Sequence, residues 1–296
     1  MRADEPIDAA LAARVREHVR KLEKRLAKAK KKRSPDAVHD GRTAIRRVTE
    51  ALTLMGWTAW DAGATSRLAD ELEPYEDALA KTRDCDVLTS TVRAWAREHR
   101  RDAKGLAELE HRLAKRRDKA ARKMKRALRG AHGTASRLDA LAQKGGVAEP
   151  KKAAKAVPAL VRHFVREIVW RQYDAVLAYD GRRSADPEIM HAFRAACRRL
   201  RYALELVGDV ADGDHVIAEL RAVQEEAGTM HDHVVASALV DEWLRRGKLH
   251  ESPALRRFTQ DLSRSIDRAR SSILKRFDRV MGERFRAELG RALEAA

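Results

Sequence analysis

Histidine and arginine recur at the same spacing in two distant stretches of the chain. One stretch reads His-Asp-Gly-Arg-Thr-Ala-Ile-Arg-Arg from His39, and the other reads His-Ala-Phe-Arg-Ala-Ala-Cys-Arg-Arg from His191. Each therefore has an arginine three positions after the histidine and an arginine pair at the seventh and eighth positions. A guanidinium group can donate two parallel hydrogen bonds to an anion, and imidazole adds a donor whose charge depends on pH. The repeated spacing indicates chemistry directed at an anion.

A helix would gather each set on one face, because successive residues turn by about 100° around the axis. The opposite side carries aliphatic side chains, such as Ile45 and Val48 in the first copy and Leu200 and Leu204 in the second. Those side chains are expected to pack in a core and leave the charged face accessible. The charged face holds His39, Arg42, Arg46 and Glu50 in the first copy, and His191, Arg194, Arg198 and Glu205 in the second.

This doubled motif resembles that of the CHAD family, the conserved histidine α-helical domain. Family members carry a His-x-x-Arg-x-x-x-Arg-Arg helix in each of two helical halves. The resemblance covers nearly the whole chain, and it implies two four-helix bundles that bind inorganic polyphosphate on a basic surface between and along the helices. The chain departs from the family pattern at Asp40 and Gly41, near which an aliphatic residue usually stands. Glycine costs a helix about 0.5–1 kcal/mol relative to alanine, so the first half is expected to be locally looser.

The composition also indicates a polyanionic partner. The chain has 296 residues and a formal net charge of +17, with 62 basic and 45 acidic side chains. Most of the excess lies in residues 1–150, which hold 35 basic and 23 acidic side chains. Such a charge argues for a partner and says little about the fold, and a merely basic protein is the alternative.

The expected architecture is all-α, because no stretch shows the alternation typical of a strand. The periodicity predicts two similar sets of four long antiparallel helices, with a polar linker near residues 145–152. The first half would comprise residues 1–146 and the second residues 153–296, and residues 63–66 would form a loop. The expected helices span residues 7–33, 35–57, 66–99 with a bend near Pro74, 105–142, 156–180, 187–208, 213–246 with a weak point at Gly228, and 252–293.

Basic rows on other helices would extend the surface of the motif helices. Like charges one helical turn apart destabilise an isolated helix, so a bound anion would compensate for them. Two of these rows, within residues 21–32 and 112–126, are dense and contain no aromatic residue. The expected polyphosphate-binding residues, motifs and rows together, are Lys21, Arg25, Lys28, Lys32, His39, Arg42, Arg46, Arg47, Arg112, Arg116, Lys119, Lys123, Arg126, Arg162, Arg166, His191, Arg194, Arg198, Arg199, Arg201, Arg264 and Arg268.

Acidic residues near the motifs leave two interpretations open. Asp84 and Asp232 follow at similar distances after the first and the second motif. Either carboxylate can pair with a motif arginine and hold it in place, or it can be an ordinary acid on a helix surface. His231-Asp232 also resembles the metal-binding pair of helical phosphohydrolases, which would need further His and Asp ligands from neighbouring helices. Asp40, the nearest acid to the first motif histidine, points away from the His39 face.

The sequence thus predicts non-catalytic binding of inorganic polyphosphate, with no catalytic residue, metal or cofactor. It shows no glycine-rich phosphate loop, nucleophile elbow or paired carboxylates at catalytic spacing. A nucleic-acid-binding protein is the alternative, and a metal-dependent phosphohydrolase of the His-Asp type is a further one. Two cysteines without metal-type spacing, and no apolar run of about 18 residues, predict a cytoplasmic protein, with association with polyphosphate granules as a further expectation.

Overall fold

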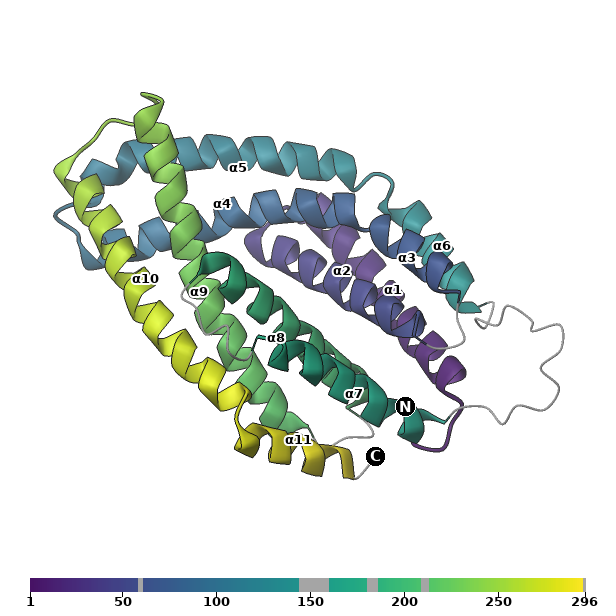
Figure 1. Ribbon diagram of the computed structural model, residues 1–296. Coiled ribbons are helices and arrows are strands. Elements are labelled where there is room, and N and C mark those ends of the chain that lie inside the picture. Colours follow the sequence, from purple (N-terminus) through teal and green to yellow (C-terminus); the bar gives the residue numbers. More distant parts are fainter. Residues whose placement is uncertain (58–60, 144–159, 180–185, 209–212, 295–296) are drawn as a thin grey trace.

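The protein is a bundle of long helices, seen in a computed structural model that describes residues 1–57, 61–143, 160–179, 186–208 and 213–294 (Figure 1). A short 3₁₀ helix, Ala103–Leu106, precedes α5. The α-helices are α1 Ile7–Lys32, α2 Pro35–Met55, α3 Ala62–Asp70, α4 Glu73–Glu98, α5 Ala107–Ala127, α6 Ala131–Gln143, α7 Val161–Leu177, α8 Pro187–Val207, α9 Asp214–Arg245, α10 Pro253–Val280 and α11 Glu283–Glu294.

Both motif helices begin with the same local device. In α2 the side chain of Ser34 accepts a hydrogen bond from the Ala37 backbone N–H at 3.3 Å, and Pro35 occupies the first turn. In α8 Asp186 accepts from the Glu188 backbone N–H at 2.8 Å, ahead of a proline in the first turn. A cap followed by proline satisfies a free helix donor and presets the backbone angle, so it fixes where each motif begins.

Three of the expected long helices are interrupted. The predicted helix 66–99 is two helices, because α3 ends before Leu72 and Pro74 lies in the first turn of α4. The predicted loop at residues 63–66 was wrong, since these residues lie in α3, whose first turn is capped by Asp61. The predicted helix 105–142 breaks around Gly130 into α5 and α6, and the last helix breaks at Met281 and Gly282.

By contrast, α9 runs through Gly228 without a break over 32 residues. A Cβ atom at this position would lie 3.2 Å from Nη2 of Arg194. The weak point expected here is therefore a place where glycine lets a motif arginine lie close to the neighbouring helix.

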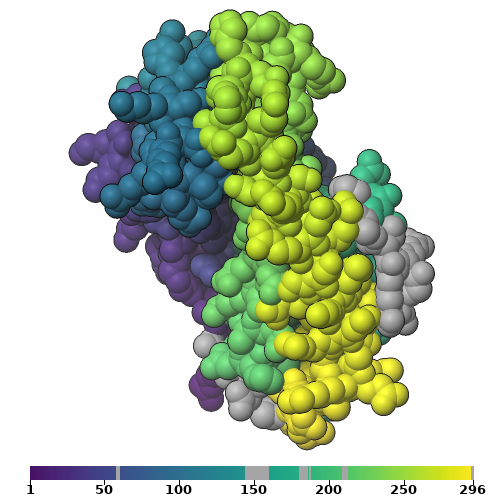
Figure 2. Space-filling view, turned by 90° about the vertical axis from the view of Figure 1, so that its left-hand side faces the viewer, coloured from purple at the N-terminus to yellow at the C-terminus, as the bar shows by residue number. Residues whose placement is uncertain are grey.

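The two halves share their hydrophobic interior. One core joins α1, α2 and α6 of the first half to α7, α8 and the start of α9 of the second. A second core lies where the end of α4 and the start of α5 meet the end of α9 and the start of α10 (Figure 1). Backbone hydrogen bonds of 3.0 Å from Val161 to Glu5 and from Arg162 to Ala3 tie the start of α7 to the start of the chain. The space-filling view shows the purple and blue first half lying against the green and yellow second half (Figure 2).

The linker predicted at residues 145–152 lies outside the described residues. Among the described helices, none has both the length and the apolar character that crossing a membrane requires.

Gly41, expected to loosen the first half, is buried where α2 meets both α1 and α4. A Cβ atom built there would lie 3.5 Å from side-chain atoms of Ala29, Leu26 and Leu79, which is ordinary packing distance. Replacing Gly41 with alanine is therefore expected to raise the free energy of unfolding by about 0.5–1 kcal/mol, because alanine loses less backbone entropy on folding. Denaturant unfolding followed by circular dichroism measures the change.

The matched control is Gly56→Ala at the end of the same helix. An added Cβ there would lie 2.9 Å from Oγ1 of Thr65, so this variant should lose stability. A destabilised Gly41→Ala variant would contradict the packing described for α1, α2 and α4.

Candidate functional site

The motif helices α2 and α8 lie in contact, and their first two arginines form one group. Burial and then the charge of Arg46 lower the pKa of Arg42. Burial lowers the pKa of Arg198 to about 10, again with Arg46 as the next cause and Arg194 contributing. The same two causes lower the pKa of Arg194. We call Arg42, Arg46, Arg194 and Arg198 the arginine cluster; it combines equivalent residues of the two halves.

The cluster has few acceptors for its donors. Glu76 of α4 accepts a hydrogen bond from Nε of Arg46 at 2.6 Å and lies 3.8 Å from Nε of Arg42. The Nε atoms of Arg42 and Arg194 are buried without a hydrogen-bond partner. Within the described residues, Arg194 and Arg198 have no carboxylate within 4.0 Å. Buried guanidinium donors without acceptors are costly, so this arrangement suits an anion that supplies oxygens.

The other predicted motif arginines do not face the cluster. Arg47 of α2 pairs with Glu205 of α8 at 3.1 Å. Arg201 and Arg221 pair with the same carboxylate at 3.2 Å and 3.1 Å. These ion pairs join α2, α8 and α9. Arg199 acts on the buried carboxyl of Glu50 instead. The Arg47–Glu205 pair joins the two halves, whereas Arg201 and Arg221 pair within the second half, and all of them are distinct from the cluster.

Both glutamates predicted on the charged faces lie away from the histidines. Glu50 is about 16 Å along the helix from His39, at 1.5 Å per residue. It is 8% exposed, and Gln172 of α7 donates a hydrogen bond to it at 3.5 Å. Burial raises the pKa of Glu50 to about 7, against the charges of Arg199 and Arg198. The face of α2 that carries both His39 and Glu50 is thus exposed at the His39 end and covered by the second half at the Glu50 end.

The middle of the basic row on α5 lies beside the cluster. Its residues Arg116, Lys119 and Lys123 line a cavity of about 310 Å³ between α4, α5 and α9, together with Lys81 and Asp84 of α4. The charges of Arg42, in the cluster, and of Arg116, in the cavity, both oppose the raised pKa of Asp84. Asp84 therefore lies near both groups and links this cavity to the cluster. Of the remaining predicted residues in the row, Arg112 pairs with Glu108 at 2.9 Å, and Arg126 is exposed outside the cavity.

The row on α1 stays apart from the cluster. Lys28 pairs with Asp40 at 3.4 Å, and Lys21 pairs with Glu17. Lys21 also lines a separate cleft of about 300 Å³ with Arg47 and Glu205. Arg25 is half-buried and Lys32 is exposed near the end of the helix.

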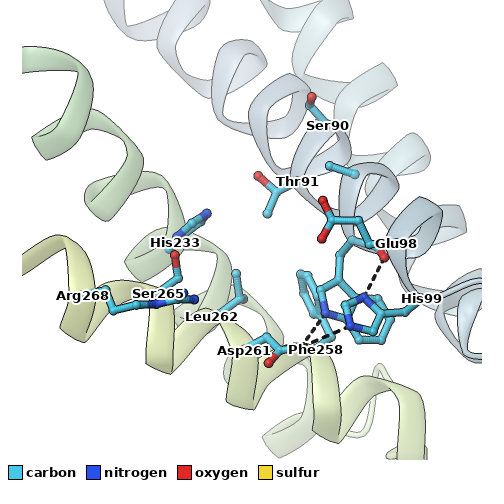
Figure 3. A pocket seen from close by; sticks show the side chains of 12 residues that line it. Ser90, Thr91, Glu98, His99, His233, Phe258, Asp261, Leu262, Ser265 and Arg268 are labelled. Atoms are coloured by element: carbon cyan, nitrogen blue, oxygen red, sulfur yellow. Dashed lines mark hydrogen bonds and ion pairs between the residues drawn. The ribbon is translucent and has the colours of Figure 1, made fainter. Parts of the chain in front are cut away.

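Four further predicted residues are not brought to the cluster either. Arg162 and Arg166 are exposed on α7. Arg264 pairs with Asp261 at 2.7 Å, and Nε of Arg268 donates to the backbone oxygen of Arg264 at 3.3 Å. Arg268 lines a different cavity, of about 520 Å³, between α4, α9 and α10 (Figure 3).

This cavity of about 520 Å³ has aromatic walls and a paired acid, Asp261. Nε1 of Trp95 donates a hydrogen bond to Asp261 at 2.8 Å, and the ring of His99 stacks on Trp95 with centroids 4.2 Å apart. Phe258, labelled in Figure 3, meets the Trp95 ring edge-on, with ring centroids 5.6 Å apart. Asp261 is thus held by Trp95 and Arg264, and the motif arginines do not line this cavity.

The motif histidines lie beside the cluster and are exposed. Desolvation and then the charge of Arg83 lower the pKa of His39. Desolvation and then His231 lower the pKa of His191, and the two rings lie 5.7 Å apart. Both imidazoles are therefore held toward the neutral form in the free protein.

His231 and Asp232 of α9 thus belong to the surroundings of the cluster. Desolvation and then Arg194 lower the pKa of His231. Within the described part of the chain, His, Cys, Asp and Glu side chains do not gather in any group of three or more that could hold a metal ion.

Several residues near the cluster were missed from the sequence. Arg83, Arg93, Arg97 and Arg117 line a cavity of about 770 Å³ that also reaches Asp232 and the start of α2. Arg93 and Arg97 are one helical turn apart, which was the available signal, but acidic and apolar neighbours hid it.

An all-α protein in which basic helices of two similar halves meet at one arginine cluster is the class that this geometry defines. The chain belongs to the CHAD family: the model of the CHAD domain matches residues 13–241 and 182–296. A crystal structure of the CHAD domain from the plant Ricinus communis is similar, with 23% sequence identity and a TM-score of 0.69, over 100% of this chain and 94% of that one.

PptA from Streptomyces chartreusis is a second similar structure, with 19% identity and a TM-score of 0.68, over 93% of this chain and 100% of that one. At these identities the two structures support the fold alone. The comparison with curated proteins gave no match.

Proposed function

We propose that the protein binds inorganic polyphosphate without turning it over, in the cytoplasm and in association with polyphosphate granules. The arginine cluster is the observation that carries this proposal, because it offers buried donors from both halves without acceptors. Membership of the CHAD family, which is linked to polyphosphate binding, supports the identity of the polymer. The structure by itself supports only an anion with many charges.

A phosphate chain fits the surroundings of the cluster better than a nucleic acid does. The cations of α5 lie next to the cluster, since Asp84 is near both groups. One phosphate chain could therefore contact the cluster and the α5 cations together. Single-stranded nucleic acids are usually bound with aromatic platforms for their bases. Tyr202, an aromatic side chain near Arg194 and Arg198, is only 7% exposed, and the guanidinium of Arg201 lies over its ring at 4.7 Å, so it offers no open ring face.

Competition between polymers tests the proposal. Labelled polyphosphate is bound at near-physiological salt and displaced by unlabelled polyphosphate or by single-stranded DNA of equal total charge. Polyphosphate should compete at least about tenfold better, which is ~1.4 kcal/mol. Both polymers lose affinity with salt, so the salt concentration stays fixed. Equal displacement by DNA would favour a nucleic-acid-binding protein, and release of orthophosphate during the assay would contradict binding without turnover.

The affinity for polyphosphate should rise as the pH falls from about 8 to 6. His39 and His191 have lowered pKa values in the free protein, and a bound anion raises them again. The complex then takes up protons that the free protein does not hold, so protons favour binding. Titrations at several pH values measure this slope, and the variant His39→Gln with His191→Gln should flatten it. An unchanged slope would assign the pH dependence to other groups.

A further inference from the structure

Two cavities meet along α4. One is the cavity of about 520 Å³ between α4, α9 and α10, which we call the aromatic cavity because Trp95, His99 and Phe258 line it. The other, of about 770 Å³, lies between α4, α5 and the start of α2, and we call it the arginine cavity. Ser90 and Thr91 line both, so the two cavities are continuous. Each is of the size that small-molecule sites have.

The arginine cavity has an excess of positive charge. It is lined by five arginines and three aspartates, which are Arg33, Arg83, Arg93, Arg97, Arg117, Asp36, Asp86 and Asp232. Asp86 is paired with Arg117 at 2.7 Å. In the part of the chain that the structure describes, the side chains of Arg83, Arg93 and Arg97 make neither a hydrogen bond nor an ion pair. Their guanidinium groups are therefore available to an anion, and each can donate two parallel hydrogen bonds to a phosphate.

The aromatic cavity has the opposite charge. Two carboxylates line it, those of Glu98 and Asp261, against one arginine, Arg268. Asp261 already accepts a hydrogen bond from Trp95, but within the described residues the carboxylate of Glu98 has no hydrogen-bond or ion-pair partner. An ionised carboxylate only accepts hydrogen bonds, so Glu98 suits a group that carries N–H donors. Phosphate is therefore repelled from this cavity and attracted to the arginine cavity.

The ring of His99 is held in place in the aromatic cavity (Figure 3). It stacks on Trp95 with an angle of 14° between the planes, and its Nδ1 donates to the backbone oxygen of Trp95 at 3.0 Å. Trp95 is itself fixed by Asp261 and Phe258. The His99 side chain is 39% exposed, so the side turned away from Trp95 is open to a flat ring. A ring that is already positioned loses little freedom when a base stacks on it.

We propose that the two cavities together bind a nucleoside polyphosphate, with the base on the ring of His99 and the phosphates among the arginines of the arginine cavity. Glu98 accepts hydrogen bonds from N–H groups of the base, and Ser90, at the junction, faces the ribose. The helix rise places His99 about 12 Å beyond Thr91 along α4, a span that an extended nucleoside triphosphate covers. The arginines of the cluster line neither cavity, so this inference goes beyond the proposed function.

A bare phosphate chain and a nucleic-acid strand each match the two cavities less well. A phosphate chain has no flat ring to stack on His99, and Glu98 and Asp261 repel it from the aromatic cavity. Strands are usually held by successive aromatic platforms. Trp95 and Phe258 are buried, so His99 is the platform that this cavity offers. One base joined to several phosphates is the ligand that suits both cavities.

Competition measures whether the base contributes to binding. Labelled ATP or GTP is bound at fixed ionic strength without divalent cations, and it is displaced by the unlabelled nucleotide or by inorganic tripolyphosphate. The better nucleotide should displace the label at least about tenfold more effectively than tripolyphosphate, because stacking adds to the phosphate contacts. Tripolyphosphate has the greater charge, so its displacing the label at an equal or lower concentration would overturn the proposal.

Removal of the platform should weaken nucleotide binding alone. His99→Asn should lower the affinity for the nucleotide about tenfold and change the affinity for long-chain polyphosphate less than about threefold. His99→Phe keeps a flat ring, and its affinity for the nucleotide should stay within about threefold of wild type. The matched control, His111→Asn, removes an exposed histidine from α5 and should change neither affinity. If His99→Phe loses as much as His99→Asn, the ring is not a platform and the proposal fails.

The phosphate end has its own pair of variants. Arg93→Ala with Arg97→Ala should lower the affinity for the nucleotide by more than about tenfold, because both guanidinium groups contact phosphate. Arg162→Ala with Arg166→Ala removes the same charge from α7, outside both cavities, and should lose less than about threefold. Equal losses in the two double variants would mean that diffuse charge holds the nucleotide, and they would contradict the proposal.

Direct titrations of wild-type protein separate this inference from the proposed function. Protein that binds long-chain polyphosphate but neither ATP nor GTP would remove this inference and leave the proposed function in place. Protein that binds a nucleotide with the expected loss in His99→Asn, but no long-chain polyphosphate, would remove the proposed function and support this inference.

Discussion

Replacing Arg46 and Arg198 with alanine should weaken polyphosphate binding by two orders of magnitude or more. Each of these arginines belongs to the cluster, and Arg46 is the strongest neighbouring charge on Arg198. A hydrogen bond to a charged group contributes about 1.5–3 kcal/mol, so two of them account for the expected loss. Equilibrium titration with a labelled chain measures the affinity, and circular dichroism checks that the helices remain.

The loss should be specific to the cluster. Arg162→Ala with Arg166→Ala removes the same charge from the exposed face of α7, outside the cluster. That control should lose less than about threefold in affinity, because exposed charges act weakly through solvent and salt. Equal losses in the two double variants would mean that the protein binds polyanions through diffuse charge, and that the cluster is not a site.

The helices that carry the site were predictable because their signals are local. Ser34-Pro35 and Asp186-Pro187 each combine a cap with a proline, and both motif helices begin there as expected. The breaks around Gly130 and at Gly282 were not predicted. Hydrophobic spacing continues across both points, and whether the chain turns there depends on which helix it must pack against next.

The composition of the site was only partly predictable for the same reason. The spacing identified Arg42, Arg46, Arg194 and Arg198, which helix geometry places on one face. It could not show that the neighbouring Arg47 turns to Glu205, 158 positions away in the chain. Contacts of this kind depend on how the two halves pack together. The helical period of a sequence gives the face on which a residue lies, but it does not give the partner of that residue on another helix.

The basic rows were also visible in the sequence, but their place in the site was only partly predictable. The α5 row was expected to extend the site, and its middle lines a cavity beside the cluster. The α10 row was the weaker signal in the sequence because Asp261 interrupts it, and Arg264 indeed pairs with Asp261. A row of cations is a local property, whereas the acids that neutralise it come from other helices or from one turn away.

Arg117 is expected to have the largest effect on stability of the residues near the site. Its Nε donates to Oδ1 of Asp86 at 2.7 Å, and the Asp86 side chain is almost completely buried. The Arg117 side chain also donates to the backbone oxygen of Arg33, the left-handed residue that ends α1. Removing one partner of a buried pair leaves an uncompensated charge.

Arg117→Met should therefore lower the free energy of unfolding by about 2–4 kcal/mol, because Oδ2 of Asp86 already lacks a partner. Adding Asp86→Leu should restore most of the loss, since two apolar side chains can replace a buried ion pair at little cost. The exposed neighbour Lys115→Met should change stability by less than about 0.5 kcal/mol. Denaturant unfolding of the four proteins measures these differences. If the double variant is no more stable than Arg117→Met, the loss comes from the contact with Arg33 and the end of α1, and the buried charge of Asp86 does not determine it.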